Sequence, residues 1–171
     1  MRAALQATMS SDRPDWNTPT EVLRLLHAGW PDGVDLDPCS NATSIVDARQ
    51  AYTEDEDGLA QTWQVPLCGL IYVNPPYGRP LPAWAQKIQR ERNAAHTIVT
   101  LIPARTDTGW WRTLVTGASH VVFLAGRLRF LGAPASAPFP SALVVHCGAN
   151  TSATRRMLRT AEDLGHWVVR P

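Results

Sequence analysis

The stretch Gly69-Leu70-Ile71-Tyr72-Val73-Asn74-Pro75-Pro76-Tyr77-Gly78 joins an apolar run directly to an amide, two prolines and an aromatic ring. Its first five residues have the length and the β-branched and aromatic content of a buried strand. Two successive prolines cannot continue a sheet ladder, so the strand is predicted to end in a rigid corner. Ligands bind at the carboxyl ends of strands in open α/β sheets, so we expect Asn74 and Tyr77 to project into a crevice.

The pattern of the whole chain predicts an α/β protein. Apolar runs alternate with helix signals as far as Leu124, and a hairpin-like pair of strands follows. This order favours a three-layer domain whose sheet is mostly parallel, with one antiparallel strand near the C-terminal half. Strands are expected at residues 34–37, 50–53, 69–73, 97–103, 120–124, 127–130, 141–147 and 167–169. Helices are expected at residues 19–29, after Cys39-Ser40-Asn41, from Pro82, around 110–115 and at 151–164. The helix from Pro82 is interpreted as scaffold, with Trp84 facing inward and Lys87 facing outward.

The length of 171 residues suits one well-buried core, which predicts a single domain over residues 14–171 with no separate target-recognition domain. Residues 1–13 lack the apolar core of a secretion signal and are interpreted as a mobile lead-in. No apolar run approaches the roughly 20 residues that cross a bilayer, so we expect a cytoplasmic protein with no membrane partner. A monomer is the default expectation. The three cysteines are widely spaced, so neither a metal site nor a disulfide framework is predicted.

Charge is distributed unevenly between the two halves of the chain. Residues 1–100 have eight basic and twelve acidic side chains, whereas residues 101–171 have eight arginines and three acids. The asymmetry suggests an acidic region for a cation-bearing cofactor and a basic region for a polyanion. Fifteen arginines against one lysine can equally reflect a GC-rich genome, so the charge supports nucleic-acid binding only together with motifs.

One local pattern predicts a helix start, and a second has both a structural and a binding interpretation. Thr18-Pro19-Thr20-Glu21 predicts a helix start in which Thr18 caps, Pro19 takes the first helical position and Glu21 completes a capping box. Asp37 ends the strand 34–37, where nucleotide-type ligands commonly meet an acid that accepts hydrogen bonds from hydroxyls or an amine. An acid at a strand-to-helix turn is also a common structural cap, so both roles remain open for Asp37.

Asn74-Pro75-Pro76-Tyr77 resembles the catalytic motif of S-adenosylmethionine-dependent methyltransferases that modify the exocyclic amine of adenine or cytosine in DNA. Further segments occur in the order seen in the phage-type DNA N-6-adenine methyltransferase family, and the resemblance spans roughly residues 14–147. These segments are Asp15-Trp16-Asn17-Thr18-Pro19, Asp35-Leu36-Asp37-Pro38, Asp57-Gly58-Leu59, Pro103-Ala104-Arg105-Thr106-Asp107-Thr108 and Pro138-Phe139-Pro140-Ser141-Ala142.

The resemblance implies a Rossmann-like methyltransferase fold, a DNA substrate, S-adenosylmethionine as cofactor and no metal. It implies that Asn74 and Pro75 accept the hydrogens of the target amine, and that Tyr77 stacks on the flipped base. The catalytic residues it implies are Asn74, Pro75, Pro76 and Tyr77. The cofactor-binding residues it implies are Trp16, Asn17, Thr18, Pro19, Asp35, Asp37, Pro38 and Asp57. The chain departs from many methyltransferases in having Asp37-Pro38-Cys39-Ser40-Asn41 where they have glycines after the strand.

DNA phosphates are expected to meet Arg79, Arg105, Arg127 and Arg129. Arg127 and Arg129 share one face of their predicted strand because they are two residues apart, although both could instead pair with surface acids. Three other functions fit the same motif: methylation of the cytosine N4 amine, methylation of a protein glutamine, or nucleic-acid binding without catalysis. We expect an adenine-specific DNA methyltransferase acting in a bacterial or phage-infected cell.

Overall fold

The computed structural model describes residues 16–171, so the lead-in predicted for residues 1–13 lies outside the described residues. Seven strands form one sheet in the order β2-β1-β3-β4-β6-β5-β7. The strands are β1 (Val34–Asp37), β2 (Ala48–Ala51), β3 (Leu70–Val73), β4 (Thr97–Pro103), β5 (His120–Phe123), β6 (Ser141–His146) and β7 (Trp167–Val169).

The sheet is parallel in its first half and antiparallel in its second. β1 pairs in parallel with β2 and β3, and β3 pairs in parallel with β4. β6 lies between β4 and β5 and runs antiparallel to both, and β7 pairs antiparallel with β5. Two strands therefore oppose the direction of the other five, which corrects the prediction of one antiparallel strand. The final strand returns to the sheet after α5 (Thr151–Asp163), and this crossover sets its direction.

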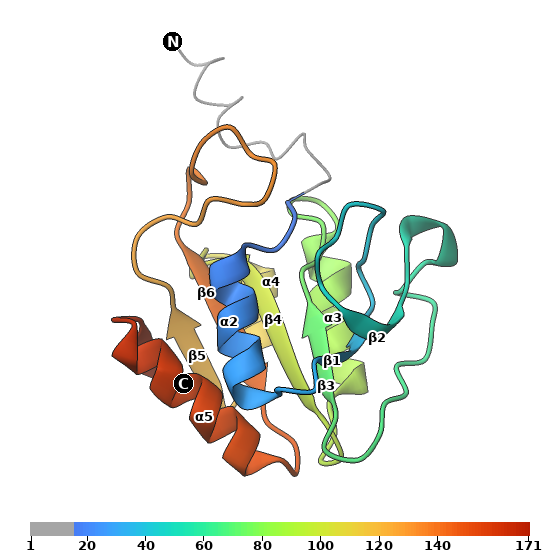
Figure 1. Ribbon diagram of the computed structural model, residues 1–171. Coiled ribbons are helices and arrows are strands. Elements are labelled where there is room, and N and C mark those ends of the chain that lie inside the picture. The colour runs from blue at the N-terminus through green and yellow to red at the C-terminus, as the bar shows by residue number, and fades with distance from the viewer. Residues whose placement is uncertain (1–15) are drawn as a thin grey trace.

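Helices cover both faces of the sheet and give three layers (Figure 1). α2 (Thr20–Gly29) packs against α5 on one face, and α3 (Leu81–Glu91) packs against α4 (Gly109–Val115) on the other. A Cβ atom added at Gly29 would lie 2.9 Å from the Ala153 carbonyl oxygen, so glycine permits the close approach of α2 and α5. Because helices lie on both faces, β3, β4 and β6 are buried at every position, as continuous apolar runs predict.

The order of the first strands creates a topological switch point between β1 and β3, at the carboxyl ends of these strands. The chain passes from β1 outward to β2 and then returns to β3 on the other side of β1. Loops leaving the carboxyl ends of β1 and β3 therefore diverge, and the gap between them is where an open α/β sheet binds ligands. Asp37 ends β1 and Asn74 follows β3, so the fold brings these two predicted site residues to the same gap.

Three local expectations were wrong. The residues after Cys39 form turns rather than a helix, because the Asn41 side-chain oxygen accepts from the Thr43 backbone N–H and hydroxyl. Residues 127–130 alternate between exposed and buried as predicted, but they form no strand because no strand within residues 16–171 pairs with them. Lys87 was placed on the outer face of α3, yet it is 7% exposed. Its ammonium donates to the Gln61 carbonyl and pairs with Glu91, which permits its burial.

None of the helices formed within residues 16–171 is long and apolar enough to cross a membrane. The same part of the chain contains no group of three or more His, Cys, Asp or Glu side chains arranged to bind a metal ion.

Candidate active site

A cavity of about 560 Å³ opens at the switch point between β1 and β3. Its walls come from the segment before α2, the turns after β1, the acidic loop after β2 and the corner after β3. Its lining residues are Trp16, Asn17, Thr18, Asp37, Pro38, Cys39, Ser40, Asn41, Ser44, Thr53, Glu54, Asp57, Gly58, Leu59, Asn74, Pro75, Pro76, Tyr77, Pro80 and Trp84. All four residues of the predicted catalytic motif lie here.

The side-chain amide of Asn74 is fixed in one orientation. Its Nδ2 donates to the Trp16 carbonyl oxygen at 2.6 Å and to the Thr18 Oγ1 at 3.2 Å. Its Oδ1 accepts from the Tyr77 hydroxyl at 3.2 Å. Both amide hydrogens are therefore used, and Oδ1 keeps a second lone pair that can accept a hydrogen from another group.

Thr18 supports Asn74 instead of capping α2, which corrects its predicted role as a helix cap. The residue that precedes the first helical turn is Pro19, and no side chain caps that end. The Thr18 hydroxyl lies 3.0 Å from the Tyr72 hydroxyl, and both side chains are buried. Because Tyr72 belongs to β3, this pair joins the segment before α2 to the strand that carries Asn74.

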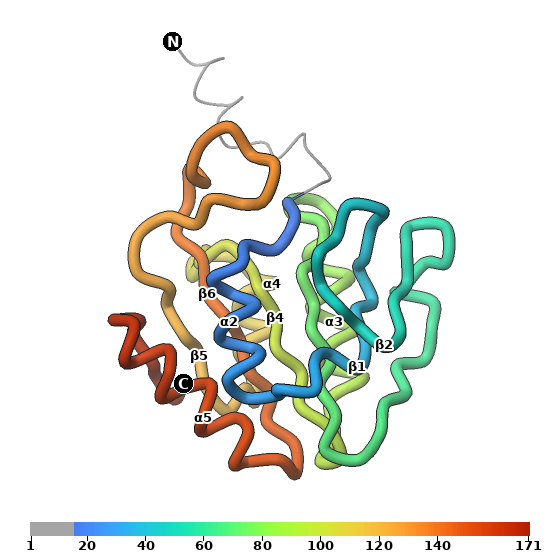
Figure 2. Tube along the Cα trace, viewed as in Figure 1, coloured from blue at the N-terminus to red at the C-terminus, as the bar shows by residue number. Residues whose placement is uncertain are grey.

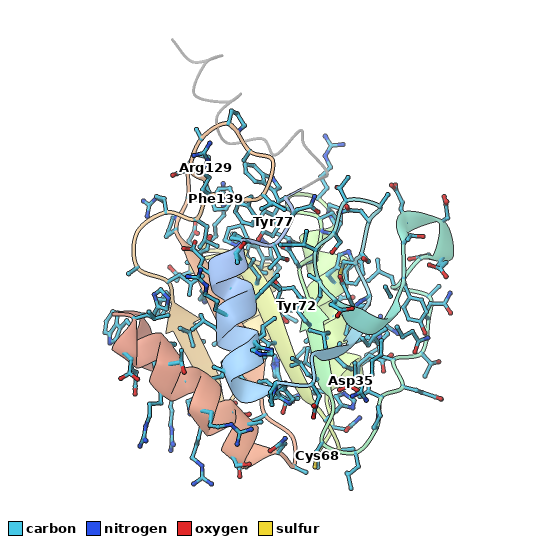
Figure 3. The ribbon with its side chains drawn as sticks, viewed as in Figure 1. Asp35, Cys68, Tyr72, Tyr77, Arg129 and Phe139 are labelled. Carbon is cyan, nitrogen blue, oxygen red and sulfur yellow. The ribbon has the colours of Figure 1, made fainter. Side chains whose placement is uncertain are left out.

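Four aromatic rings pack around the corner after β3. The Tyr77 ring lies 5.9 Å from Phe130 and 5.7 Å from Phe139, edge-on to both. Trp16 packs edge-on against the same two phenylalanines, with a centroid distance of 4.9 Å to Phe130. Figure 3 places Tyr77 and Phe139 close together at one end of the sheet. Burial raises the pKa of the Tyr77 hydroxyl well above its usual value, so it remains a neutral donor to Asn74.

Asp37 is a buried carboxylate at the floor of the cavity. It is 3% exposed, and its Oδ1 accepts from the Cys39 backbone N–H at 3.0 Å. Burial raises the pKa of Asp37 to about 6, although hydrogen bonds from Cys39 and Ser40 oppose that rise. A buried charge with so few partners is costly in the folded protein, which is a common property of groups retained for binding.

Asp57 adds a second carboxylate at the exposed mouth of the cavity. Its backbone has a left-handed φ of 51°, and its Oδ1 accepts from the Leu59 backbone N–H at 3.1 Å. A Cβ atom at Gly58 would lie 2.0 Å from the Pro38 carbonyl oxygen, so only glycine lets this loop approach the turn after β1. With Glu54, the described lining contains three acids and no lysine or arginine.

Two predicted cofactor residues do not line the cavity. Pro19 is buried at the start of α2. The Asp35 carboxylate accepts from the Leu70 backbone N–H at 2.8 Å and pairs with Arg49 at 3.2 Å. Figure 3 shows Asp35 toward the end of the sheet that is remote from Tyr77. Asp35 therefore connects β1 to the start of β3, and the structure does not bring it to the site.

The geometry agrees with what the sequence matches among known proteins. The family model described as DNA N-6-adenine-methyltransferase (Dam) matches residues 6–144. The chain belongs to the DNA N-6-adenine-methyltransferase (Dam) family. It is also 27% identical over 125 residues to a protein of Haemophilus phage HP1 named DNA N-6-adenine-methyltransferase, a match that covers 72% of this chain and 70% of the phage protein.

Membership of the Dam family makes this chain an adenine-specific DNA methyltransferase. The match includes every residue that lines the cavity, and it includes Phe130 and Phe139. The Dam region ends within β6, so α5 and β7 lie beyond the matched residues.

The four arginines predicted to meet DNA lie outside the cavity lining of this Dam family member. Arg79, Arg127 and Arg129 are exposed, and Arg105 is half-buried. Within residues 16–171, no acidic side chain lies within ion-pair distance of any of the four. The alternative that Arg127 and Arg129 pair with surface acids thus has no support in the described part of the chain. Their contact with DNA remains a prediction.

Sequence reasoning missed several residues that complete the site. Phe130 and Phe139 enclose Tyr77, although only Phe139 belonged to a family segment. Trp84 was assigned to the scaffold, yet it lines the cavity from the first turn of α3. The missed polar lining residues are Cys39, Ser40, Asn41, Ser44, Thr53 and Glu54. Their only sequence signal was their position in the loops that follow β1 and β2. Loops at the carboxyl ends of strands beside a switch point line the ligand crevice of open α/β sheets.

Asp37→Asn and Asp35→Asn are expected to change stability in opposite directions, although the two residues share one strand. A buried carboxyl whose pKa has risen to about 6 costs roughly 3 kcal/mol when it is charged. Asp37→Asn should therefore raise the free energy of unfolding at pH 8. The advantage should shrink as the pH falls from 6 toward 4, and it would vanish only below the ordinary pKa of 3.8, where the parent carboxyl is neutral in both states.

Asp35→Asn should lower the free energy of unfolding at pH 8 by up to about 1 kcal/mol, because it removes the charge that pairs with the largely exposed Arg49 and accepts from the Leu70 N–H. Denaturant unfolding of both variants across pH 4 to 8 measures both effects. A less stable Asp37→Asn variant at pH 8 would contradict the account of Asp37.

Proposed function

We propose that this Dam family member transfers a methyl group from S-adenosylmethionine to the N6 amine of an adenine in DNA, with the cavity between β1 and β3 as its site. The observation that carries the proposal is the Asn74 amide, which is fixed by Trp16 and Thr18 and leaves Oδ1 able to accept another hydrogen. We further propose that the three-layer fold is the Rossmann-like methyltransferase fold, since its switch point creates this site.

The chemistry of the lining fits S-adenosylmethionine. The cofactor has a sulfonium and an ammonium against one carboxylate, and the cavity has acids without a basic side chain. Asp37 would accept hydrogen bonds from the ribose hydroxyls, and Asp57 would accept from the adenine amine of the cofactor. Trp84, Leu59 and Pro76 provide apolar lining for its ring system. Once bound, the cofactor supplies a methyl group attached to a sulfonium leaving group.

The residues after β3 would activate the acceptor amine. The lone pair of an aryl amine is delocalised into its ring, so the amine is a poor nucleophile. Asn74 Oδ1 and the Pro75 carbonyl would accept its two hydrogens, draw the nitrogen toward tetrahedral geometry and stabilise the positive charge that develops there. Pro75 and Pro76 restrict the backbone, so these acceptors need little reorganisation during the reaction.

The acceptor base must leave the duplex to reach this corner, because its amine is inaccessible within a stacked helix. Flipping costs a few kcal/mol, and stacking of the base on Tyr77 would recover part of that cost. Arg79, Arg105, Arg127 and Arg129 would contact phosphates around the opening. We propose that the protein acts in the cytoplasm, where phage or bacterial DNA lies.

The other functions compatible with Asn74-Pro75-Pro76-Tyr77 have less support. Methylation of cytosine or of a protein glutamine would use the same corner, but the family match specifies adenine. A module that bound nucleic acid without catalysis would not need the cofactor, so it would not need the buried Asp37, whose charged form is disfavoured by burial.

Asp37→Asn and Asp57→Ala should each weaken S-adenosylmethionine binding by about 1 to 3 kcal/mol, since each removes a charged acceptor. Affinity for the cofactor in the parent should also fall between pH 7 and pH 5, because Asp37 becomes protonated below about pH 6. Isothermal titration calorimetry measures both effects. Asp35→Asn is the matched control and should bind the cofactor like the parent, whereas parent-like affinity in both lining variants would exclude this cofactor site.

Asn74→Ala should lower the turnover of methyl transfer to DNA by at least about 100-fold, the effect of losing one group that stabilises the transition state. Cofactor affinity should change little, because the interaction with the amine forms only as the base reacts. The measurement is transfer of labelled methyl groups to unmethylated plasmid DNA at saturating cofactor. A variant as fast as the parent would show that Asn74 does not act on the amine.

A further inference from the structure

A tight turn holds a leucine out into solvent beside the candidate active site. The Ala133 N–H donates to the Phe130 carbonyl at 3.0 Å, and Gly132 has a φ of +77°, as the third residue of a type II turn requires. Leu131 occupies the corner of this turn and is 39% exposed. A Cβ atom added at Gly132 would meet no atom of residues 16–171 within 4 Å, which places this side of the turn at their surface.

The turn is joined to the residues that position Asn74. The Leu131 N–H donates to the Asn17 carbonyl at 3.0 Å, and the neighbouring Trp16 carbonyl accepts from Asn74. Phe130 packs against Tyr77 and Trp16 from the other side of the turn. Figure 2 shows this orange loop beside the blue segment that leads into α2. Leu131 is therefore held at a fixed place relative to the catalytic corner, in contrast to a leucine on a loosely attached loop.

Two cations precede the leucine on the same exposed side of the segment. Arg127, Arg129 and Leu131 are exposed, whereas the residues between them, Leu128 and Phe130, are buried. The Arg129 Nε donates to the Ala133 carbonyl, which bends this side chain across the turn and leaves its terminal nitrogens available. In Figure 3, Arg129 lies at the end of the molecule where Phe139 and Tyr77 lie. This arrangement is complementary to a DNA duplex, because the two cations can contact phosphates while the apolar side chain contacts stacked bases.

We propose that Leu131 inserts into the duplex and fills the gap left when the target adenine flips toward Tyr77. Apolar side chains, including leucine, separate base steps in this way in proteins that deform DNA. The proposal rests on the proposed function, because it requires a base to leave the duplex. Arg127 and Arg129 contact the flanking phosphates, and the turn sets the distance between the inserted side chain and the catalytic corner.

The test separates flipping from methyl transfer. A site methylated by the parent on plasmid DNA is first mapped and then placed in two synthetic duplexes. In one duplex the target adenine is paired with thymine, and in the other it lies opposite an abasic position, which removes the pairing that flipping must break. The kcat/KM for methyl transfer is measured on both duplexes for the parent, Leu131→Ala, Leu131→Met and Leu67→Ala. Leu67 is the matched control, being 75% exposed in the turn before β3.

Leu131→Ala should lose about tenfold on the paired duplex and less than twofold on the duplex with the abasic position. Leu131→Met keeps the apolar bulk and should stay near the parent on both, as should Leu67→Ala. Parent-like activity of Leu131→Ala on the paired duplex, or an equal loss on both duplexes, would overturn the proposal for Leu131 and leave the proposed function intact. A parent that transfers no methyl group to any DNA would overturn the proposed function and this proposal together.

Discussion

The geometry of the candidate site depends on the hydrogen bonds that fix the orientation of the Asn74 amide. An asparagine side chain can rotate by 180° and exchange its oxygen for its nitrogen, which would present donors where acceptors are needed. The Trp16 carbonyl can only accept, so it selects the orientation with Nδ2 directed toward it. Thr18, held by Tyr72 of β3, also accepts from Nδ2, and Tyr77 donates to the opposite end of the amide. The segment before α2 thus fixes the orientation of a side chain at the candidate active site.

The burial of Asp37 disfavours its charged form in the folded protein. Asp37 is nearly inaccessible to water and has few partners, so its charge is unfavourable until a cationic or hydrogen-bonding ligand arrives. Asp35, two residues earlier, accepts from the Leu70 N–H and pairs with Arg49, and it holds β1 to the start of β3. The two acids lie two residues apart on one strand, yet Asp35 meets a cation and a backbone N–H, whereas burial disfavours the charge of Asp37. Such a division is common where stability and function compete.

The sequence predicted those parts of the structure that depend on short-range patterns. β3 and β4 were found almost to the residue, since a continuous apolar run between breakers has few other interpretations. The corner at Asn74-Pro75-Pro76-Tyr77 was found because two prolines must end the strand. Asp37 was predicted at the site because it ends a strand, whereas Asp57 was predicted from the family resemblance, and both line the cavity.

The errors came from partners distant in sequence. Thr18 has the pattern of a helix cap, but its hydroxyl meets Tyr72, 54 residues away. Lys87 is charged and was expected in solvent, but the Gln61 carbonyl and Glu91 satisfy it inside the protein. Residues 127–130 have the alternation of a strand without a neighbour to pair with. For Thr18 and for residues 127–130, the outcome depends on the arrangement of strands in the sheet, which no local pattern specifies. For Lys87 it depends on a loop carbonyl, which the helix pattern does not reveal.

The central claim is that the segment before α2 orients Asn74 for catalysis, and the turnover of Thr18 variants tests it most directly. Thr18→Val keeps the shape of the side chain but removes the oxygen that accepts from Asn74, whereas Thr18→Ser keeps that oxygen. At saturating S-adenosylmethionine and DNA, we predict a kcat for Thr18→Ser within about twofold of the parent and a kcat for Thr18→Val about tenfold lower, the loss of one hydrogen bond of roughly 1.4 kcal/mol. A Thr18→Val variant with the kcat of the parent would contradict the account.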